Sequence, residues 1–464
     1  MHEILFQQTD DKVKKLIGLL KKTINGTLFE GKVYIVGGAL RNSFLGLPIH
    51  DIDIVVNIEG GGIAFANFFC KMSKCFIENE NPVIYKNTST AKFQLHQSEV
   101  FKDIIIECSQ TRKEFLHNST KDVFGTLEED SKLRDLTINS LYYDISNDRL
   151  IDYNSSIDDI KNMVIRTPNI PDKIYEADPL RILRAIKYSC HYGWGIARDT
   201  WLGMVKNAHL ISTVAQERIT SELSEMLVMD NPSKFIIKMY NCGILDEVLP
   251  DIYGIKSVFE SKDLNVTTFD HTMLVLDNVQ PLLEHRLAAL YHDVGKILFE
   301  RDKTIDIDTF SAEVASHDLK MMKFSRKTIK SVEKAIQYHR HFDKYADGTL
   351  PSDKKIRKFL NNIGDNLAVV ADLMNANNNH CVYGKKKRQV LDILNRIEEL
   401  EDAEKAANVK LPINGNDIQQ YFSIKPSPVV GIALEKVKDA YFENPNMTKD
   451  EALEIVEKLL KTIY

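Results

Sequence analysis

Residues 33–53 read VYIVGGALRNSFLGLPIHDID, and this stretch decides the fold of the N-terminal part of the chain. The apolar run 33–36 predicts a buried strand that ends in a tight turn at Gly37 and Gly38. A helical pattern follows over residues 40–45, and residues 52–56 predict a second strand. A strand, a glycine turn, a short helix and another strand therefore follow one another closely.

The polar residues of this stretch are typical of a phosphate and metal site. A glycine pair lets backbone N–H groups approach a phosphate, and Arg41 adds a charged donor one helical turn later. Residues two apart in a strand share a face, so Asp51 and Asp53 present paired carboxylates. Carboxylate pairs of this kind are ligands that Mg²⁺ accepts. The stretch therefore predicts a site for phosphoryl transfer.

Further strands are predicted over 83–85, 91–95 and 104–106, and a lead helix over 11–22. Glu107 closes the last of these strands and is the expected third carboxylate of a two-metal site. From Pro179 onward helical patterns dominate and we expect no strands. The prediction is an α+β chain, with a small mixed head that ends near residue 153 and an elongated helical body.

Composition excludes several classes of protein. The chain has 464 residues, 44% of them hydrophobic and 27% charged, which is ordinary for a globular protein of roughly three domains. The sequence contains no run of about 18 apolar residues, so it predicts no membrane span. The N-terminus also lacks the apolar core of a signal peptide. Six scattered cysteines without a CxxC pair indicate reduced thiols. We therefore expect a cytoplasmic protein.

Charge is unevenly distributed along the chain, although the net charge is −6. Residues 317–358 contain twelve Lys and Arg against five Asp and Glu, and residues 385–388 read KKKR. Such clusters are either solvated helix faces or a track for a nucleic-acid backbone.

Four ordered motifs carry a family resemblance that runs over nearly the whole chain. They are GGALR…LG…DID (37–53), RDLTIN (134–139), DPLRILR (178–184) and QERI (216–219). In these the chain resembles the class II tRNA nucleotidyltransferase/poly(A) polymerase family, and it looks closest to the long bacterial form with an HD domain. The tail segment 412–418 is similar as well.

The resemblance implies a role for each matching residue. Asp51 and Asp53 would hold two Mg²⁺ ions, and Glu107 would act as general base on the RNA 3′-hydroxyl. The remaining matches would bind the nucleotide: Gly37, Gly38 and Arg41 at the triphosphate, Arg134, Asp135 and Asn139 at the phosphates and ribose, Asp178 and Arg181 as a fixed edge that pairs with the base, and Arg184 near the phosphates.

Three departures from the family pattern bear on nucleotide selectivity. Leu133 stands where the family has a first Arg, Ala177 where it has a Glu, and residues 155–156 are SS where a Gly is usual. Without the resemblance, Asp178 and Arg181 would be interpreted as an i, i+3 ion pair at a helix N-terminus.

A second set of residues has the ligand types of an HD metal site: His271, His292, Asp293 and Asp372. Residues 290–296 (LYHDVGK) resemble the HD phosphohydrolases, but Ala312 replaces a His that the family usually has. A structural remnant and a weak phosphohydrolase with one divalent metal both remain open.

The expected function is addition of C, C and A to the 3′ end of tRNA from CTP and ATP with Mg²⁺. The alternatives are a poly(A) polymerase, an enzyme that adds only part of CCA, an HD phosphohydrolase whose head merely binds RNA, and a non-catalytic RNA-binding protein. The expected regions are an N-terminal helix (1–30), the head (31–153), a nucleotide-recognition and RNA-binding neck (154–262), the HD domain (263–380) and a helical tail (381–464).

Overall fold

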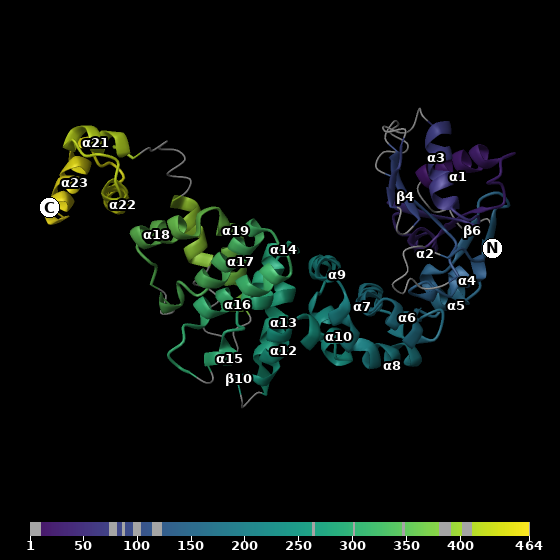
Figure 1. Ribbon diagram of the computed structural model, residues 1–464. Coiled ribbons are helices and arrows are strands. Elements are labelled where there is room, and N and C mark those ends of the chain that lie inside the picture. The colour runs from purple at the N-terminus through teal and green to yellow at the C-terminus, as the bar shows by residue number, and fades with distance from the viewer. Residues whose placement is uncertain are drawn as a thin grey trace. The chain divides into compact units, whose positions relative to one another are not determined.

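The computed structural model describes residues 11–73, 81–85, 89–95, 104–113, 123–261, 265–299, 302–345, 349–379, 391–400 and 411–463. The chain divides into two compact units (Figure 1). Unit 1 comprises Met1–Met226 with Lys234–Val248, and unit 2 comprises Leu227–Ser233 with Leu249–Tyr464. Cys75, Cys381 and the basic run 385–388 lie outside the described residues.

A seven-stranded mixed sheet forms the centre of unit 1, in the order β3-β4-β5-β2-β1-β6-β7. Only β2 and β5 are paired in parallel, and the other neighbours are antiparallel. The strands are β1 (Val33–Val36), β2 (Asp51–Val56), β3 (Val83–Tyr85), β4 (Thr90–Leu95), β5 (Ile104–Gln110), β6 (Tyr142–Asp144) and β7 (Arg149–Ile151).

Helix α3 (Gly61–Met72) packs on β2, β4 and β5. Its Phe65 and Phe69 are fully buried, as are Ile106 and Cys108 of β5. The alternate residues of β5, among them Glu107, face away from α3 because side chains alternate along a strand. Helix α3 thus covers one face of the sheet and leaves the carboxylates on the other. The remaining helices of the head are α1 (Asp11–Ile24), α2 (Gly38–Leu45) and α4 (Leu127–Ser131).

The rest of unit 1 is almost entirely helical, and α7 carries the residues that matter for the site. A two-stranded parallel sheet of β8 (Val164–Ile165) and β9 (Gly195–Ile196) flanks it. The helices are η4 (Thr137–Asn139), α5 (Ser156–Lys161), α6 (Pro171–Ala177), α7 (Leu180–Tyr192), α8 (Arg198–Asn207), η5 (Ala208–Thr213), α9 (Gln216–Val228), α10 (Ser233–Cys242) and α11 (Leu245–Val248).

The described residues of unit 2 are helical apart from a hairpin of β10 (Phe259–Ser261) and β11 (Val266–Thr267). Its helices are α12 (Pro250–Gly254), η6 (Ile255–Ser257), α13 (Thr268–Asn278), α14 (Leu283–Tyr291), α15 (Lys296–Phe299), α16 (Ile307–Met321), α17 (Arg326–Tyr338), η7 (Asp343–Tyr345), α18 (Asp353–Ile363), η8 (Gly364–Asn366), α19 (Leu367–Asn379), α21 (Gly415–Phe422), α22 (Pro428–Glu443) and α23 (Lys449–Ile463). Within the described residues, no helix is both long and apolar enough to cross a membrane.

The predicted α+β class, with a mixed head and a helical body, is confirmed. The expectation that strands end before Pro179 is wrong, because β9, β10 and β11 lie beyond it. These strands have only two or three residues, too few for a period-two pattern to stand out. The four cysteines that the structure describes in full, Cys70, Cys108, Cys190 and Cys242, are free thiols.

Candidate active site

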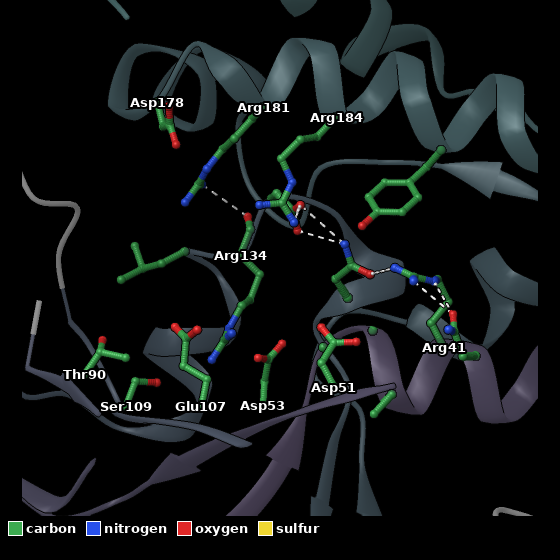
Figure 2. A pocket seen from close by; sticks show the side chains of 18 of the residues that line it. Arg41, Asp51, Asp53, Thr90, Glu107, Ser109, Arg134, Asp178, Arg181 and Arg184 are labelled. Atoms are coloured by element: carbon green, nitrogen blue, oxygen red, sulfur yellow. Dashed lines mark hydrogen bonds and ion pairs between the residues drawn. The ribbon is translucent and has the colours of Figure 1, made fainter. Parts of the chain in front are cut away.

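Three carboxylates lie together on the face of the sheet opposite α3. The parallel pairing of β2 with β5 sets Asp53 directly beside Glu107, and Asp51 lies two residues earlier on the same face of β2. Figure 2 shows the three side chains in a row, with Arg134 above them. The register of two central strands therefore assembles the predicted acidic cluster.

Burial and crowding disfavour the charged form of Asp53. They raise the pKa of its carboxyl from 3.8 to about 6, with burial as the main cause and the charges of Asp51 and Glu107 adding to it. Arg134 and Arg184 act in the opposite direction without cancelling the effect. A partly buried carboxylate that is short of positive charge, beside a second carboxylate on the same strand face, fits a hard divalent cation such as Mg²⁺. Asp51 and Asp53 could therefore hold the metal.

The glycine turn approaches the same carboxylate closely. Gly37 has φ 79° and ψ −142°, a backbone conformation that side chains rarely adopt. A Cβ at this position would lie 2.8 Å from Oδ2 of Asp53. Helix α2 begins at the next residue, and its first residues, Gly38 and Ala39, line the cavity. Glycine is required here because both the backbone angle and the space exclude a side chain.

Arg41 is held tightly beside the turn and is only 7% exposed. Its Nη1 donates to Oδ1 of Asn139 over 2.5 Å, and its Nη2 donates to Asn42. The guanidinium carbon lies 4.6 Å from the centre of the Tyr188 ring. The arginine expected at the triphosphate is therefore held in position by these contacts.

Asp135 lies between Asn139 and Arg184. Asn139 Nδ2 donates to Oδ1 of Asp135 over 3.1 Å, and Arg184 Nη2 lies 2.9 Å from its Oδ2. Burial alone would raise the pKa of Asp135, but the nearby Arg184 and Arg181 outweigh it and the net pKa is lowered. Asp135 therefore stays ionised and forms an ion pair with Arg184.

Arg134 has a structural partner as well as a place in the cavity wall. Its Nη2 lies 2.6 Å from Oδ2 of the fully buried Asp130, which also accepts from the hydroxyl of Tyr142. This pairing raises the pKa of Arg134 despite its burial, so the charge is permanent. The resemblance had implied only a nucleotide contact for this residue.

Asp178 is paired with Arg218. Its Oδ2 accepts from Nη2 of Arg218 over 2.8 Å, and its Oδ1 accepts from the backbone N–H of Leu180. Arg181 instead donates to the backbone oxygen of Arg134 over 3.5 Å. The charge of Asp178 also acts on Arg181, as the i, i+3 interpretation expects, so Asp178 interacts with both arginines. Arg218 belongs to the QERI motif, and nothing in the sequence indicates that it pairs with Asp178.

A cavity of about 360 Å³ brings these residues together (Figure 2). Leu133, which replaces an expected cation, forms part of its wall and is buried. All twelve predicted residues of the head site line this cavity: Gly37, Gly38, Arg41, Asp51, Asp53, Glu107, Arg134, Asp135, Asn139, Asp178, Arg181 and Arg184.

A second polar cluster lies in unit 2. Within the described part of the chain, His271, His292 and Asp293 form the one group whose potential ligand atoms lie within 4.8 Å of one another. All three are buried. Three of the four predicted HD residues are therefore brought together.

The fourth predicted HD residue, Asp372, does not join this cluster. Its Oδ2 lies 2.6 Å from Nδ1 of His285 and accepts from the backbone N–H of Gln280. The amide oxygen of Asn377, on the same helix α19, lies 2.9 Å from Nε2 of His271 instead. The expectation that Asp372 is a ligand of this cluster is therefore wrong. The neutral amide of Asn377 contacts His271 instead.

Two cations of the chain already neutralise Asp293. Arg340 Nη2 contacts Oδ1 of this carboxylate, and Lys296 Nζ lies 2.7 Å from its Oδ2. These ion pairs hold the pKa of Asp293 well below its ordinary value in spite of burial. A metal ion would have to displace both cations from the only carboxylate of the cluster. The cluster keeps ligand types and a spacing that could hold one metal ion, and such an ion would compete with Arg340 and Lys296 for Asp293.

Several cations of the basic region 317–358 also have partners within unit 2. Arg340 pairs with Asp308 as well, and Lys354 contacts Glu443. Arg357 donates to the backbone oxygen of Phe442. These three side chains of the region therefore take part in contacts within unit 2.

The mixed sheet carries three carboxylates beside a glycine turn, and helix α7 contributes Arg181 and Arg184 to the same cavity. This arrangement defines a nucleotidyltransferase head. Three family models match the chain: "Poly A polymerase head domain" over residues 33–166, "Probable RNA and SrmB- binding site of polymerase A" over residues 193–254, and "HD domain" over residues 268–379. The chain belongs to the class II tRNA nucleotidyltransferase/poly(A) polymerase family.

Individual relatives agree over different lengths. The CCA-adding enzyme of Ligilactobacillus salivarius is 25% identical over 99% of both chains. The multifunctional CCA protein of Neisseria gonorrhoeae is 31% identical over 57% of this chain and 62% of its own length. The solved Thermotoga maritima CCA-adding enzyme, complexed with tRNA, covers 100% of this chain and 98% of its own, with a TM-score of 0.63 at 18% identity. This structural likeness establishes a shared fold.

Proposed function

We propose that this chain adds C, C and A to the 3′ end of tRNA, using CTP and ATP. The observation that carries the proposal is the cluster of Asp51, Asp53 and Glu107 beside the glycine turn. The similarity to a CCA-adding enzyme over 99% of both chains supports tRNA as the RNA substrate. The Thermotoga relative that was solved with tRNA supports the same choice.

The proposed reaction is an in-line displacement at the α-phosphorus. The RNA 3′-oxygen forms a bond to phosphorus while the bond to the bridging oxygen of the leaving pyrophosphate breaks. Mg²⁺ held by Asp51 and Asp53 would polarise the phosphate and neutralise developing charge. Glu107, beside Asp53 on the neighbouring strand, would accept the proton of the 3′-hydroxyl.

The chain supplies the remaining positive charge and the geometry. Gly37 and the N-terminus of α2 would receive the triphosphate together with Arg41. Asp178 and Arg181 would present acceptor and donor groups to the base. In this chain Ala177 replaces the family's Glu, and the ion pair with Arg218 holds the Asp178 carboxylate in place. Positioning of this kind lowers the barrier because the reactants meet already oriented.

The test is extension of three RNAs: tRNA lacking CCA, tRNA ending in CC, and an unstructured RNA. With CTP and ATP together, we expect the first to gain CCA, the second to gain A, and the third to remain unextended. Replacing Asp51 and Asp53 by Asn should abolish extension, while Glu59→Gln, at an exposed carboxylate of the head, should not. Untemplated A-tracts on the unstructured RNA without C incorporation would support a poly(A) polymerase and refute the proposal. An activity that survives the double Asn variant but is lost in His292→Ala would identify a phosphohydrolase.

A further inference from the structure

One face of helix α7 carries four side chains that reach the head site. Arg181, Arg184, Tyr188 and Tyr192 are spaced three or four residues apart, so they lie above one another along the helix. The first three line the cavity. The arginines belong to the predicted nucleotide-binding residues, whereas no role has been assigned to either tyrosine.

Tyr188 contacts Arg41 across the site. Its ring lies under the guanidinium of Arg41, with 4.6 Å between the guanidinium carbon and the ring centre. Tyr192 adds a second, more distant ring at 5.7 Å from Arg41. An aromatic residue of the helix that carries Arg181 and Arg184 therefore contacts the arginine expected at the triphosphate.

Helix α7 reaches Arg41 by a second route as well. Arg184 pairs with Asp135, Asp135 accepts from Asn139, and Asn139 accepts from Arg41. Tyr188, on the same helix as Arg184, contacts Arg41 directly. A displacement of α7 is therefore transmitted to Arg41 through both sets of contacts.

We propose that Tyr188 is a positioning residue that holds Arg41 toward the triphosphate and couples it to the base-reading helix. The proposal rests on the proposed nucleotidyl transfer. Arginine has a long side chain with many rotamers, and ordering it on binding costs affinity. The electron-rich face of Tyr188 removes part of that cost because it attracts the guanidinium before the nucleotide arrives. The aromatic ring is the essential element.

The test compares Tyr188→Leu with Tyr188→Phe, which keeps the ring. A cation–π contact of a partly buried arginine predicts that Tyr188→Leu raises KM for CTP and for ATP about five- to tenfold, with kcat little changed. Tyr188→Phe should keep both KM values within about twofold of wild type. Tyr421→Leu, an exposed tyrosine of unit 2, provides the matched control. If Tyr188→Leu lowers Tm, Tyr188→Met is tested in its place, because methionine fills more of the volume of the ring.

Binding of inorganic tripolyphosphate separates this proposal from the proposed function. We expect Tyr188→Leu to weaken tripolyphosphate binding by the same factor as it raises KM, and to leave binding of cytidine unchanged. Equal KM values in wild type and Tyr188→Leu would overturn the inference, as would a loss confined to kcat. Weaker cytidine binding with normal tripolyphosphate binding would instead make Tyr188 a base-stacking residue. If wild type binds tripolyphosphate but extends no RNA, the proposed function fails while the role of Tyr188 is still measured by binding.

Discussion

Replacing Asp53 by Asn should stabilise the metal-free protein and abolish nucleotidyl transfer at the same time. Burial and two neighbouring carboxylates raise the pKa of Asp53 from 3.8 to about 6. In the metal-free folded state at neutral pH this carboxyl is therefore ionised, although its surroundings favour the protonated form. Asparagine has nearly the same shape and removes that charge.

The magnitude follows from the pKa shift. A raised pKa in the folded state contributes stability that is fully present below pH 3.8 and is lost as pH rises through about 6. The shift corresponds to at most about 3 kcal/mol at pH 7.5. For a unit of this size each kcal/mol changes Tm by about 2–4 °C. We expect Asp53→Asn to raise the free energy of unfolding by about 1–3 kcal/mol and Tm by several degrees.

Thermal unfolding at several pH values, with and without Mg²⁺, measures this effect. The gain in Tm should appear as pH rises from about 4 to 7 and should shrink when Mg²⁺ saturates wild type, because the ion binds the ionised carboxylate. Glu59→Gln is the control for loss of an acidic charge on the head. A lower Tm for Asp53→Asn at pH 7.5 without metal would refute the assignment of Asp53 as an uncompensated buried carboxylate, and so would a pH-independent difference.

Three further predictions concern single side chains. Gly37→Ala places a Cβ against the carboxylate of Asp53 and should lower kcat/KM about 100-fold in the tRNA extension assay, with a normal overall fold by circular dichroism. Arg218→Gln releases Asp178 from a partly exposed ion pair and should weaken discrimination against UTP and GTP about two- to fivefold, and unchanged misincorporation would exclude this role. Arg340→Met leaves the buried HD carboxylate short of a cation and should cost about 3–5 kcal/mol of unfolding free energy in the absence of metal. Metal analysis provides the check on this last prediction, because a stoichiometric divalent ion at the HD cluster of wild type would contradict it.

The strands that carry Asp51, Asp53 and Glu107 could be predicted because the signal for each lies within a few consecutive residues. The alternation of Asp51 and Asp53 with buried Ile52 and Ile54 is a period-two signal within one strand. The same reasoning identified Glu107 at the end of an apolar run, and the structure sets it beside Asp53. A short-range pattern sufficed because the strand alternation itself determines which face each carboxylate takes.

Several elements of the head were not predicted from the sequence, among them β6 and α3. Strand β6 has three residues and is defined by its pairing with β1 about a hundred positions earlier, as in Ile35 with Tyr143. Helix α3 begins with Gly61 and Gly62, which are poor helix formers. Packing on the sheet favours that helix over the local preference of its residues.

The sequence also does not reveal which side chains of distant helices contact each other. Asp178 and Arg218 are forty positions apart, and the spacing within each motif does not reveal that they meet. Asp372 and Asn377 both lie on α19, but five residues turn a helix through more than a full revolution and set the two side chains on different faces. Only the packed structure decides which of them reaches His271.

The parallel pairing of β2 with β5 has a consequence for how this enzyme family can change. The spacing between Asp53 and Glu107 is set by main-chain hydrogen bonds inside the sheet, so insertions in the segments that join the strands leave it intact. A deletion of one residue within β5, ahead of Glu107, would turn that side chain to the side of α3 and bring an apolar or thiol group into its place. The head should therefore tolerate wide variation in the length of its connections and almost none within these two strands.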